Sequence, residues 1–424
     1  MVKETISLLL ALFSILLISA QEPNVKPEIK KSGKLKVTGY VQPQWQIGEE
    51  AASLQVGKEK QEDDQDELFN RVGIRRGRIR FFYDDGNIGS GGFQFNVIDK
   101  PGLEGAQVQI KELYLNLKAP WNKASSFQAG VFNRPFGFEV NYSSSSIESP
   151  ERSRITASLL PDECDLGGMI VLTPDKSSPF HFLTFQGGFF AGNGINPETD
   201  NRKDFIGQLV ASKSFGEMHM GVGVSYYNGG VFQTNDSVYS MNGNAFSLDV
   251  DAANKGDYSK REYLGFDAQI KLKSSLGLTQ LRGEFIFGTQ PGTSSSSCSP
   301  SRSKLPSPED TYVRPFSGGY VMLIHYIGKS PFSAVLKYEI YDPNSAVSGN
   351  DIGANGSFTG KTDIQYNTLG AGVYWQITPD VRTTLYYDMN TNETSGWLSS
   401  TGYKNDYAAD RNDNVLTMRV QYKF

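Results

Sequence analysis

The sequence predicts an all-β fold, and three of its features support this. From about residue 34 to the C-terminus, stretches of roughly ten residues alternate apolar and polar side chains, the two-residue period of a strand with one apolar face. Gly, Pro, Asn or Asp bounds each stretch, and the connections alternate between short and long. Together they predict a transmembrane antiparallel β-barrel of about 16 strands, with short periplasmic turns and long extracellular loops.

Composition excludes several other classes. The 424 residues carry 41 Lys+Arg against 46 Asp+Glu, and the mean hydropathy is −0.39. The longest apolar run, residues 6–20, is shorter than the roughly 20 residues of a membrane-spanning helix, which excludes a helical bundle. Two Cys and three His fit no metal-site spacing, so no metal or cofactor is expected. The net charge of −5 argues against nucleic acid as a partner.

The N-terminus has the pattern of an export signal. Lys3 is basic, residues 6–18 are apolar, and Ile18-Ser19-Ala20 leads into a cleavage site before Gln21. We therefore expect a signal peptide over residues 1–20, a short periplasmic segment over 21–33 and an outer-membrane barrel over 34–424. The expected location is the outer membrane of a Gram-negative-type bacterium.

The expected strands follow in order along the chain. Alternation is clearest in residues 264–273, 332–340 and 416–424. The sixteen candidates lie near 34–47, 70–83, 90–98, 107–118, 125–136, 168–174, 180–191, 204–215, 217–229, 262–274, 276–288, 318–328, 331–342, 365–378, 380–390 and 413–424. Pro43 does not suit a central strand because it has no N–H to donate, so we expect a bulge or a strand end there.

Loop length separates this barrel from soluble β folds. Tight links such as 84–87 and 215–216 follow even-numbered strands, whereas mostly long ones follow odd-numbered strands. The long connections include 137–167, 230–261, 290–317, 343–364 and 391–412. A soluble sandwich or propeller explains the alternation of side chains but not this alternation of loop lengths, which is typical of outer-membrane barrels.

The second expected strand carries a row of cations. Arg76, Arg78 and Arg80 share one face at intervals of roughly 7 Å, and the opposite face ends in Phe81 and Tyr83, so the Arg face should line the lumen. Adjacent guanidinium groups at that spacing repel by about 2 kcal/mol at an effective dielectric near 20, so negative partners should lie nearby. A permeating oxyanion held by the planar guanidinium forks is one such partner.

Fixed carboxylates are the alternative partners, and the sequence leaves both possibilities open. Glu112 and Glu284 are expected to face the lumen. The long loop after the fifth strand is acidic, with two cations, Arg152 and Arg154, against Glu139, Glu148, Glu151, Asp162, Glu163 and Asp165. An acidic loop facing a basic wall is the arrangement of a general diffusion porin.

Across the clearer strands the lumen is predicted to be basic. The expected lumenal cations are Arg76, Arg78, Arg80, Lys271, Lys273, Arg282, Lys337, Arg382, Arg419 and Lys423. The expected lumenal anions are Glu112, Asp267, Glu284, Glu339 and Asp388. Ten cations against five anions would raise the local concentration of anions.

Several segments resemble the phosphate-selective porin O/P family. Residues 75–81, RRGRIRF, are similar to the family's Arg-rich early strand. Residues 130–139, GVFNRPFGFE, resemble its G-x-x-x-x-P-F-G-x-E segment, and residues 150–153, PERS, its following loop. The terminal residues 419–424, RVQYKF, resemble outer-membrane barrels generally, where a final Phe is the assembly signal. The family motifs cover only about residues 70–170.

The resemblance implies a sixteen-stranded, usually trimeric, anion-preferring channel narrowed by inward-folded loops. The expected solutes are small anions, phosphate or related oxyanions, with a general channel for small hydrophilic solutes as the alternative. The expected partners are outer-membrane lipid, two further copies in a homotrimer, and the barrel-assembly machinery through Phe424. The residues expected along the anion pathway are Arg76, Arg78, Arg80, Arg134, Arg152, Arg154, Lys271, Lys273, Arg282, Arg382 and Arg419.

An enzyme is not expected. Barrel lipases and proteases need a histidine oriented as a base near the rim, and nothing in the sequence orients His219 or His325, both of which are expected to face inward. Cys164 and Cys298 fall in expected extracellular loops, where an oxidising environment permits a disulfide, but their spacing does not show whether they meet.

Overall fold

The computed structural model describes residues 33–60, 66–98, 105–299, 310–403 and 405–424, apart from the side chain of Lys123. The expected signal peptide and residues 21–32 lie outside the described residues. The first strand of the barrel begins at Lys34. Among the described residues, no helix is long and apolar enough to cross a bilayer.

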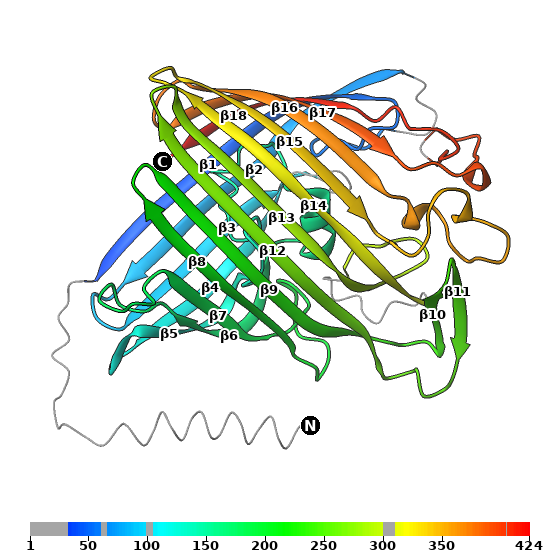
Figure 1. The fold of residues 1–424 in the computed structure, drawn as a ribbon, viewed down its shortest axis with the longest axis horizontal. Helices are drawn as coiled ribbons and strands as arrows, with labels where there is room; N and C mark the ends of the chain where they lie inside the picture. The colour runs from blue at the N-terminus through cyan, green and yellow to red at the C-terminus, as the bar shows by residue number, and fades with distance from the viewer. Residues whose placement is uncertain (1–32, 61–65, 99–104, 300–309, 404) are drawn as a thin grey trace.

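The wall is a closed antiparallel barrel (Figure 1). Its first nine strands are β1 (Lys34–Glu49), β2 (Leu68–Asp84), β3 (Gly89–Ile98), β4 (Gln107–Ala119), β5 (Asn122–Asn133), β6 (Cys164–Leu172), β7 (Leu183–Phe190), β8 (Asp204–Phe215) and β9 (Met218–Phe232). The other seven are β12 (Tyr258–Ser274), β13 (Gly277–Gly292), β14 (Thr311–Ile327), β15 (Phe332–Asp342), β16 (Tyr366–Gln376), β17 (Val381–Asn392) and β18 (Val415–Lys423). Pairing of β1 with β18 closes the wall. The predicted sixteen-stranded barrel is therefore confirmed.

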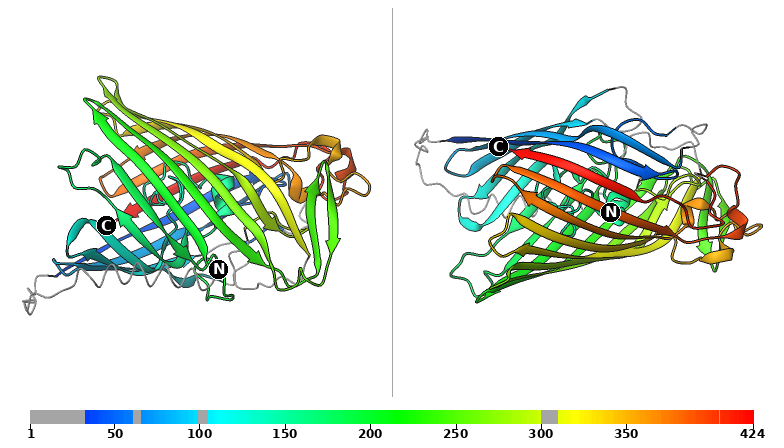
Figure 2. Two further views of the ribbon diagram at one scale, coloured as in Figure 1. Left: turned by 60° about the horizontal axis from the view of Figure 1, so that its bottom comes forward. Right: turned by 90° about the horizontal axis from the view of Figure 1, so that it is seen from above.

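The two rims differ as predicted. Short turns such as Gly216 and the Gly328–Pro331 link lie at one rim, near the start of β1 and the C-terminus, and the long loops gather at the other (Figure 2). Asp85 caps one short turn by accepting hydrogen bonds from the backbone N–H groups of Asn87 and Gly89. Compact turns on one rim leave the other rim to carry the loops that shape the entrance.

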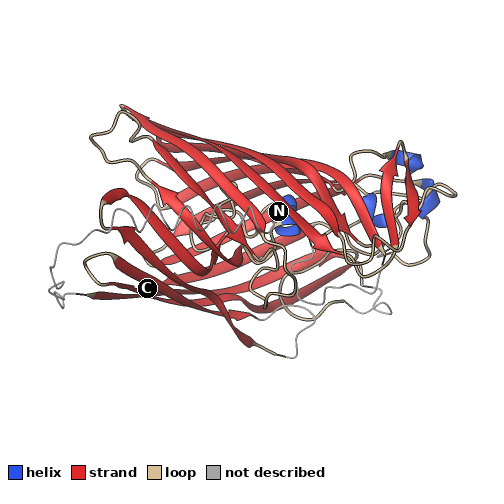
Figure 3. Cartoon of the chain, turned by 90° about the horizontal axis from the view of Figure 1, so that it is seen from below, coloured by secondary structure: helices blue, strands red, loops and turns tan. Residues whose placement is uncertain are grey.

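One additional hairpin was not predicted. Strands β10 (Ser237–Asn242) and β11 (Ala245–Val250) rise from the loop between β9 and β12, and β10 runs parallel to the start of β14 through Val238, Tyr239 and Ser240. The hairpin stands at the long-loop rim beside the short 3-10 helices of the loops after β15 and β17 (Figure 3). Tyr239 and Tyr312 stack with ring centroids 4.3 Å apart, which fastens the hairpin to the wall.

Apolar side chains cover the outer face. Leu35 and Val37 on β1 and Leu113, Leu115 and Leu117 on β4 are exposed, as lipid contact requires. At the chain end, the rings of Tyr422 and Phe424 lie 5.9 Å apart on this face, and Phe424 pairs with Gly39 through two backbone hydrogen bonds of 2.9 Å. The final aromatic residue therefore completes the seam between β18 and β1.

Three register shifts interrupt the pairing of the early strands: one beside the turn between β4 and β5, and two β-bulges within strands. The first bulge lies opposite Pro43, as predicted: Gln42 pairs with Arg76 and Pro43 with Ile74, so Arg75 is the extra residue. The second lies on β4, where Gln94 pairs with Glu112 and Phe95 with Ile110, so Lys111 is the extra residue. Each bulge lets two consecutive side chains point into the lumen, which strict alternation forbids.

An apolar cluster fills one side of the lumen. It joins the inward faces of β5 to β9 and β12 to β15 to the loop after β5 and to the short helix α2 (Arg154–Leu159) within it. Its buried members are Phe132, Phe136, Val140, Ile155, Leu159, Leu160, Met169, Phe190, Ile206, Tyr227, Tyr263, Ile286, Phe316 and Tyr341. Burial of this surface fixes the loop inside the barrel.

Candidate functional site

The loop between β5 and β6, residues 134–163, crosses the lumen. Near its start, the Gly137 N–H donates to Ser225 Oγ on β9 at 2.9 Å, and Gln208 on β8 donates to the Gly137 carbonyl at 2.9 Å. Gly137 has a φ of +60°, a conformation that glycine adopts without a steric penalty. On the far side, Gln42 on β1 donates to the Ser144 carbonyl at 3.2 Å. The loop is therefore held from wall to wall.

Cations of the wall hold the middle of the loop. Arg282 on β13 forms a bidentate ion pair with Glu148 at 2.6 and 2.7 Å. Arg382 on β17 donates to the Ile147 carbonyl at 3.1 Å. Two predicted pathway residues therefore contact the loop itself, and their charges are partly occupied in holding it in position.

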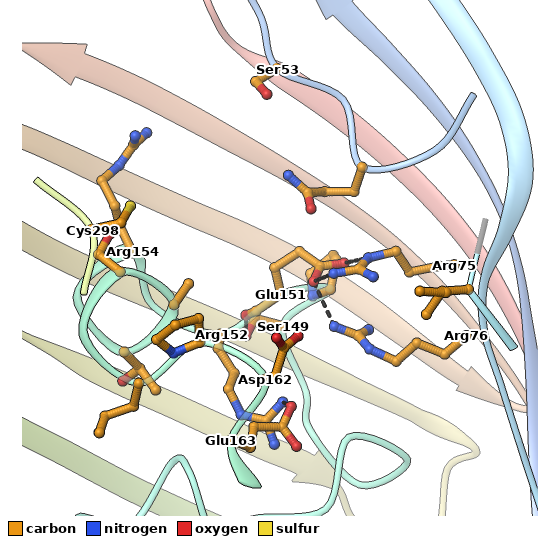
Figure 4. Close-up of a pocket in the computed structure, with 18 of the residues that line it drawn as sticks. Ser53, Arg75, Arg76, Ser149, Glu151, Arg152, Arg154, Asp162, Glu163 and Cys298 are labelled. Atoms are coloured by element: carbon orange, nitrogen blue, oxygen red, sulfur yellow. Dashed lines mark hydrogen bonds and ion pairs between the residues drawn. The ribbon is translucent and has the colours of Figure 1, made fainter. Parts of the chain in front are cut away.

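Three guanidinium groups converge on one loop carboxylate, Glu151, and those of Arg75 and Arg76 are seen beside it in Figure 4. Arg75 binds it in a bidentate manner at 2.8 Å, and Arg76 and Arg419 each approach it at 2.7 Å. Burial alone would raise the pKa of Glu151, but these three cations outweigh it and hold the pKa well below its usual range. The carboxylate therefore stays ionised at any physiological pH.

A second carboxylate, Glu163, collects the next group of cations. Lys111 on β4 lies 3.1 Å from it, Arg78 lies 3.9 Å from it, and Arg152 from the same loop binds its other oxygen. Burial raises the pKa of Glu163, but Arg152, Lys111 and Arg78 lower it by more, so its pKa is also depressed. Arg78 donates in addition to Asn96 at 3.1 Å and Ser144 at 3.2 Å.

Arg76, Arg78 and Arg80 form the predicted row of cations on β2, which we call the ladder. Arg80 is the most accessible of the three. Its Nε lies 3.3 Å from Glu112, and its Nη2 donates to the Tyr114 hydroxyl at 2.6 Å. The side chain is 37% exposed, against 7% for Arg76 and 9% for Arg78. The predicted ladder does face the lumen, but each of its members is bonded to a fixed protein group.

The cations that surround the carboxylates Glu112, Glu151 and Glu163 outnumber these carboxylates. Seven cations surround the three carboxylates Glu112, Glu151 and Glu163 within the described residues; they are Arg75, Arg76, Arg78, Arg80, Lys111, Arg152 and Arg419. The difference, seven minus three, leaves four positive charges. We call these ten residues the arginine cluster.

A cavity of about 560 Å³ opens above the arginine cluster on the long-loop side. Its floor is the loop segment with Glu151 and Arg152, and Arg75 and Arg76 form one wall (Figure 4). Arg154 also lines it, and its guanidinium carbon lies 4.2 Å from the centroid of the Tyr366 ring. A solute entering between the long loops meets these cations before it passes the crossing loop.

The opposite wall carries the predicted lumenal anions. Asp267 and Glu284 face each other on β12 and β13, and Glu339 on β15 accepts an ion pair from Lys337 at 2.7 Å. Asp388 on β17 also lines the cavity. Cations on β18 to β4 thus face these carboxylates on β12 to β17, a wall that also carries the cations Arg282, Lys337 and Arg382.

The remaining predicted pathway residues lie elsewhere. Arg134 is 2% exposed and is enclosed by an ion pair to Asp165 at 3.2 Å and a hydrogen bond to the Pro161 carbonyl at 3.1 Å. Lys271 and Lys273 lie on the inner face near the short-turn rim, away from the cavity. They could meet a solute only at the other mouth of the barrel.

The two bulges bring in cations that sequence reasoning missed. Strict alternation puts Arg75 and Lys111 on the lipid face, yet both bind loop carboxylates inside the barrel. Pro43 was the available signal for Arg75, because the bulge that it predicts shifts the facing strand by one residue. For Lys111 the sequence offers no comparable signal.

The histidines and cysteines need two corrections, since His325 does not face the lumen and Cys164 begins strand β6 rather than lying in a loop. His219 faces the lumen, where its ring nitrogens contact Ser212 and Ser214 at 3.1 and 3.0 Å, as expected. His325 does not face the lumen. It pairs with Thr279, two residues along from the exposed pair Leu281 and Leu323, and side chains two residues apart lie on the same face of a strand. His325 therefore lies on the outer face. Cys164 is buried, Cys298 is exposed, and the two are not bonded to each other.

Comparison with known proteins gives a consistent answer at the level of fold. No protein-family model and no curated protein matches the sequence. The outer-membrane channel DcaP of Acinetobacter baumannii is similar in structure, with a TM-score of 0.55 and 10% identity over 93% of this chain and 98% of that chain. OprB of Pseudomonas putida gives 0.50 and 10% over 92% and 94%. OmpT of Vibrio cholerae, in its trimer form, gives 0.50 and 11% over 92% and 99%.

These neighbours share the closed sixteen-stranded wall described above. At such low identity the likeness concerns the fold alone. It does not show that the chain belongs to the phosphate-selective family that the sequence motifs resemble. The closed barrel, its apolar outer face and its unequal rims are those of an outer-membrane barrel. The chain has the fold of the outer-membrane porins.

Proposed function

We propose that this chain is a passive diffusion channel of the outer membrane that prefers small anions. The observation that supports it is the charge surplus of the arginine cluster, seven cations against three carboxylates. The entrance cavity itself is lined by seven cations and five carboxylates among the described residues, a smaller surplus of the same sign. A ring of one sign raises the local concentration of the opposite ion and lowers its barrier to dehydration. In this proposal the preference for anions follows from the surplus of positive charge in the arginine cluster, rather than from a row of unpaired arginines.

Phosphate and related oxyanions are the proposed solutes. Guanidinium groups bind tetrahedral oxyanions through paired N–H donors, and Arg75, Arg76 and Arg154 present such groups to the cavity. The carboxylate of Glu151 already occupies the site between Arg75 and Arg76. A solute would therefore be held weakly and briefly, as conduction requires.

A general diffusion porin for small hydrophilic solutes is the second candidate. It is favoured by the fixed partners of the ladder, since Arg76 is bonded to Glu151, Arg78 to Asn96 and Ser144, and Arg80 to Tyr114. In that case the cluster sets up a field across the lumen and stabilises the loop, and net ion preference is small.

Assembly belongs to the same proposal. The exposed apolar outer face could supply contacts between copies within the membrane, and the trimer form of the Vibrio cholerae neighbour supports a homotrimer for this chain. The terminal Phe424 is proposed as the residue that the barrel-assembly machinery recognises.

Reversal potentials of single channels in a potassium chloride gradient test the proposal. Anion preference predicts a potential displaced toward the chloride equilibrium value, and phosphate should reduce the chloride current. Replacing Arg76, Arg78 and Arg80 together by Gln removes three charges while keeping polarity, so the permeability ratio of chloride to potassium should fall several-fold and the phosphate block should weaken.

Lys213→Gln is the matched control. Lys213 lies on the outer face, over the ring of Phe215, and its loss removes a cation without altering the lumen. The control should keep the wild-type reversal potential. If the wild-type channel shows no ion preference, or if the triple variant retains all of it, the general porin is the correct function.

A further inference from the structure

Two lumenal carboxylates stand out because they lack ion pairs. Asp267 on β12 and Glu284 on β13 are 6% and 5% exposed, yet neither forms an ion pair with any described Lys or Arg. The carboxylates of the crossing loop are different, since Glu139, Glu148 and Glu151 each lie within 4.0 Å of a cation. Burial without a counter-charge is costly, so this pair needs another source of positive charge.

The two side chains lie next to each other. Asp267 and Glu284 are direct partners in the antiparallel register of β12 and β13, and both point into the lumen. Side chains in such a position have Cβ atoms roughly 4.5–5.5 Å apart, close enough for both carboxylates to contact one small ion. The register alone therefore creates a two-carboxylate site.

One oxygen of each carboxylate is unoccupied. Glu284 Oε2 accepts from the backbone N–H groups of Phe138 and Glu139 at 3.3 and 3.0 Å, and Asp267 Oδ1 accepts from Gln269 at 3.4 Å. Glu284 Oε1 and Asp267 Oδ2 are buried and accept no hydrogen bond. Two buried, unpartnered oxygens from adjacent strands are what a cation would bind.

Glycines provide the space for these oxygens. A Cβ atom on Gly137 would collide with Glu284 Oε1, and a Cβ atom on Gly223 would collide with Asp267 Oδ2. Gln208 lies beside Asp267, and both Gln208 and Ser225 bind Gly137. Arg282, two residues from Glu284 along β13, does not supply the missing cation, because it is paired with Glu148.

We propose that Asp267 and Glu284 form a calcium-binding site in the lumen. The candidate ligands among the described residues are oxygen atoms, which suits a hard cation, and calcium accepts irregular sets of carboxylate, neutral oxygen and water ligands. The ion would join β12 and β13 to the start of the crossing loop, because Glu284 already holds the loop backbone at Phe138 and Glu139. This site is independent of the proposed anion preference.

Calcium binding can be measured directly on the folded barrel in detergent. Equilibrium dialysis with radioactive calcium should give one ion per chain with a dissociation constant in the range of about 10⁻⁴ to 10⁻³ M that is common for extracellular sites. The temperature at which the barrel loses its compact form on a gel should rise with added calcium and fall with a chelator. D267N/E284Q should remove both effects.

Asp388→Asn is the matched control, because Asp388 is a lumenal carboxylate that pairs with no described Lys or Arg but faces no second carboxylate across its strand pair. It should retain calcium binding. If the double variant fails to form a barrel, E284Q alone serves, and its binding should weaken at least tenfold. The proposal is overturned if the wild-type barrel binds no calcium, or if D267N/E284Q binds it as well as wild type does; in the first case a shared proton would account for the pair.

Discussion

Glu151→Gln is the perturbation that separates the charge surplus from the hydrogen-bond geometry. The substitution keeps an oxygen that can accept from Arg75, Arg76 and Arg419 but removes one negative charge from beside the cavity. The surplus in the arginine cluster then rises from four to five. Anion preference should therefore increase, whereas loss of Arg76 should decrease it.

The size of the change can be worked out from the geometry. Glu151 retains 27% exposure, so its charge acts through water; at roughly 7 Å from a passing ion this amounts to about 0.6 kcal/mol. Salt at 0.1 M has a Debye length of about 10 Å and halves it to about 0.3 kcal/mol. The effect on a cation has the same size and the opposite sign, so the two together change the ratio of chloride to potassium permeability by about 0.6 kcal/mol. That ratio should therefore rise about threefold.

Reversal potentials in a potassium chloride gradient would measure this change, and the effect should shrink as the salt concentration rises. Glu262→Gln is the matched control, because Glu262 is an ion-paired carboxylate on the outer wall, beside Lys260. Three results would refute the predicted role of the Glu151 charge: E151Q lowers the ratio of chloride to potassium permeability, E151Q and R76Q change that ratio in the same direction, or E262Q raises it as much as E151Q does.

Three further predictions concern assembly, oligomer and pH. Deleting Phe424 should lower the amount of heat-modifiable barrel in the outer membrane, because its ring and backbone complete the β1–β18 seam; an unchanged amount would show that it is dispensable. Native mass measurement in mild detergent should give three chains, and a monomer at all concentrations would contradict the trimer. The pKa values of Glu151 and Glu163 are depressed, so the stabilisation that these carboxylates give is complete above about pH 4.5 and is lost only as pH falls through the lower folded values. The difference in reversal potential and in unfolding temperature between wild type and E151Q should therefore stay constant from about pH 8 to about pH 5. A change in that difference near pH 4.5 would show that the cations do not reach Glu151.

The wall was predictable because its signals are local. Two-residue alternation identifies a strand and its lipid face without any knowledge of its neighbours, and loop lengths identify the rims. The predicted inward cations on the later strands, such as Arg282, Arg382 and Arg419, do contact groups inside the barrel. The short hairpin of β10 and β11 was missed because its six-residue strands lie within a long loop and pair with β14 only at Val238 to Ser240.

The site was less predictable because it depends on pairs of distant segments. A bulge is a property of two strands, so the inward position of Arg75 follows from Pro43 on a neighbouring strand and that of Lys111 from a register change beside Gln94. Sequence identified Glu151 and Glu163 as acidic loop residues, but their choice of partners required the path of the loop across the lumen.

The apolar cluster within the barrel has a consequence for how such a channel can diversify. It attaches one side of the loop to β5 to β9 and β12 to β15 by contacts that involve no solute, whereas the charged side faces β18 to β4. This part of the anchorage does not depend on the charged residues proposed to select solutes, although those residues bind the loop as well. Substitutions along the charged edge can alter which ions pass while the dry side keeps the loop in place, so a lineage could acquire a new permeability without first losing a folded barrel.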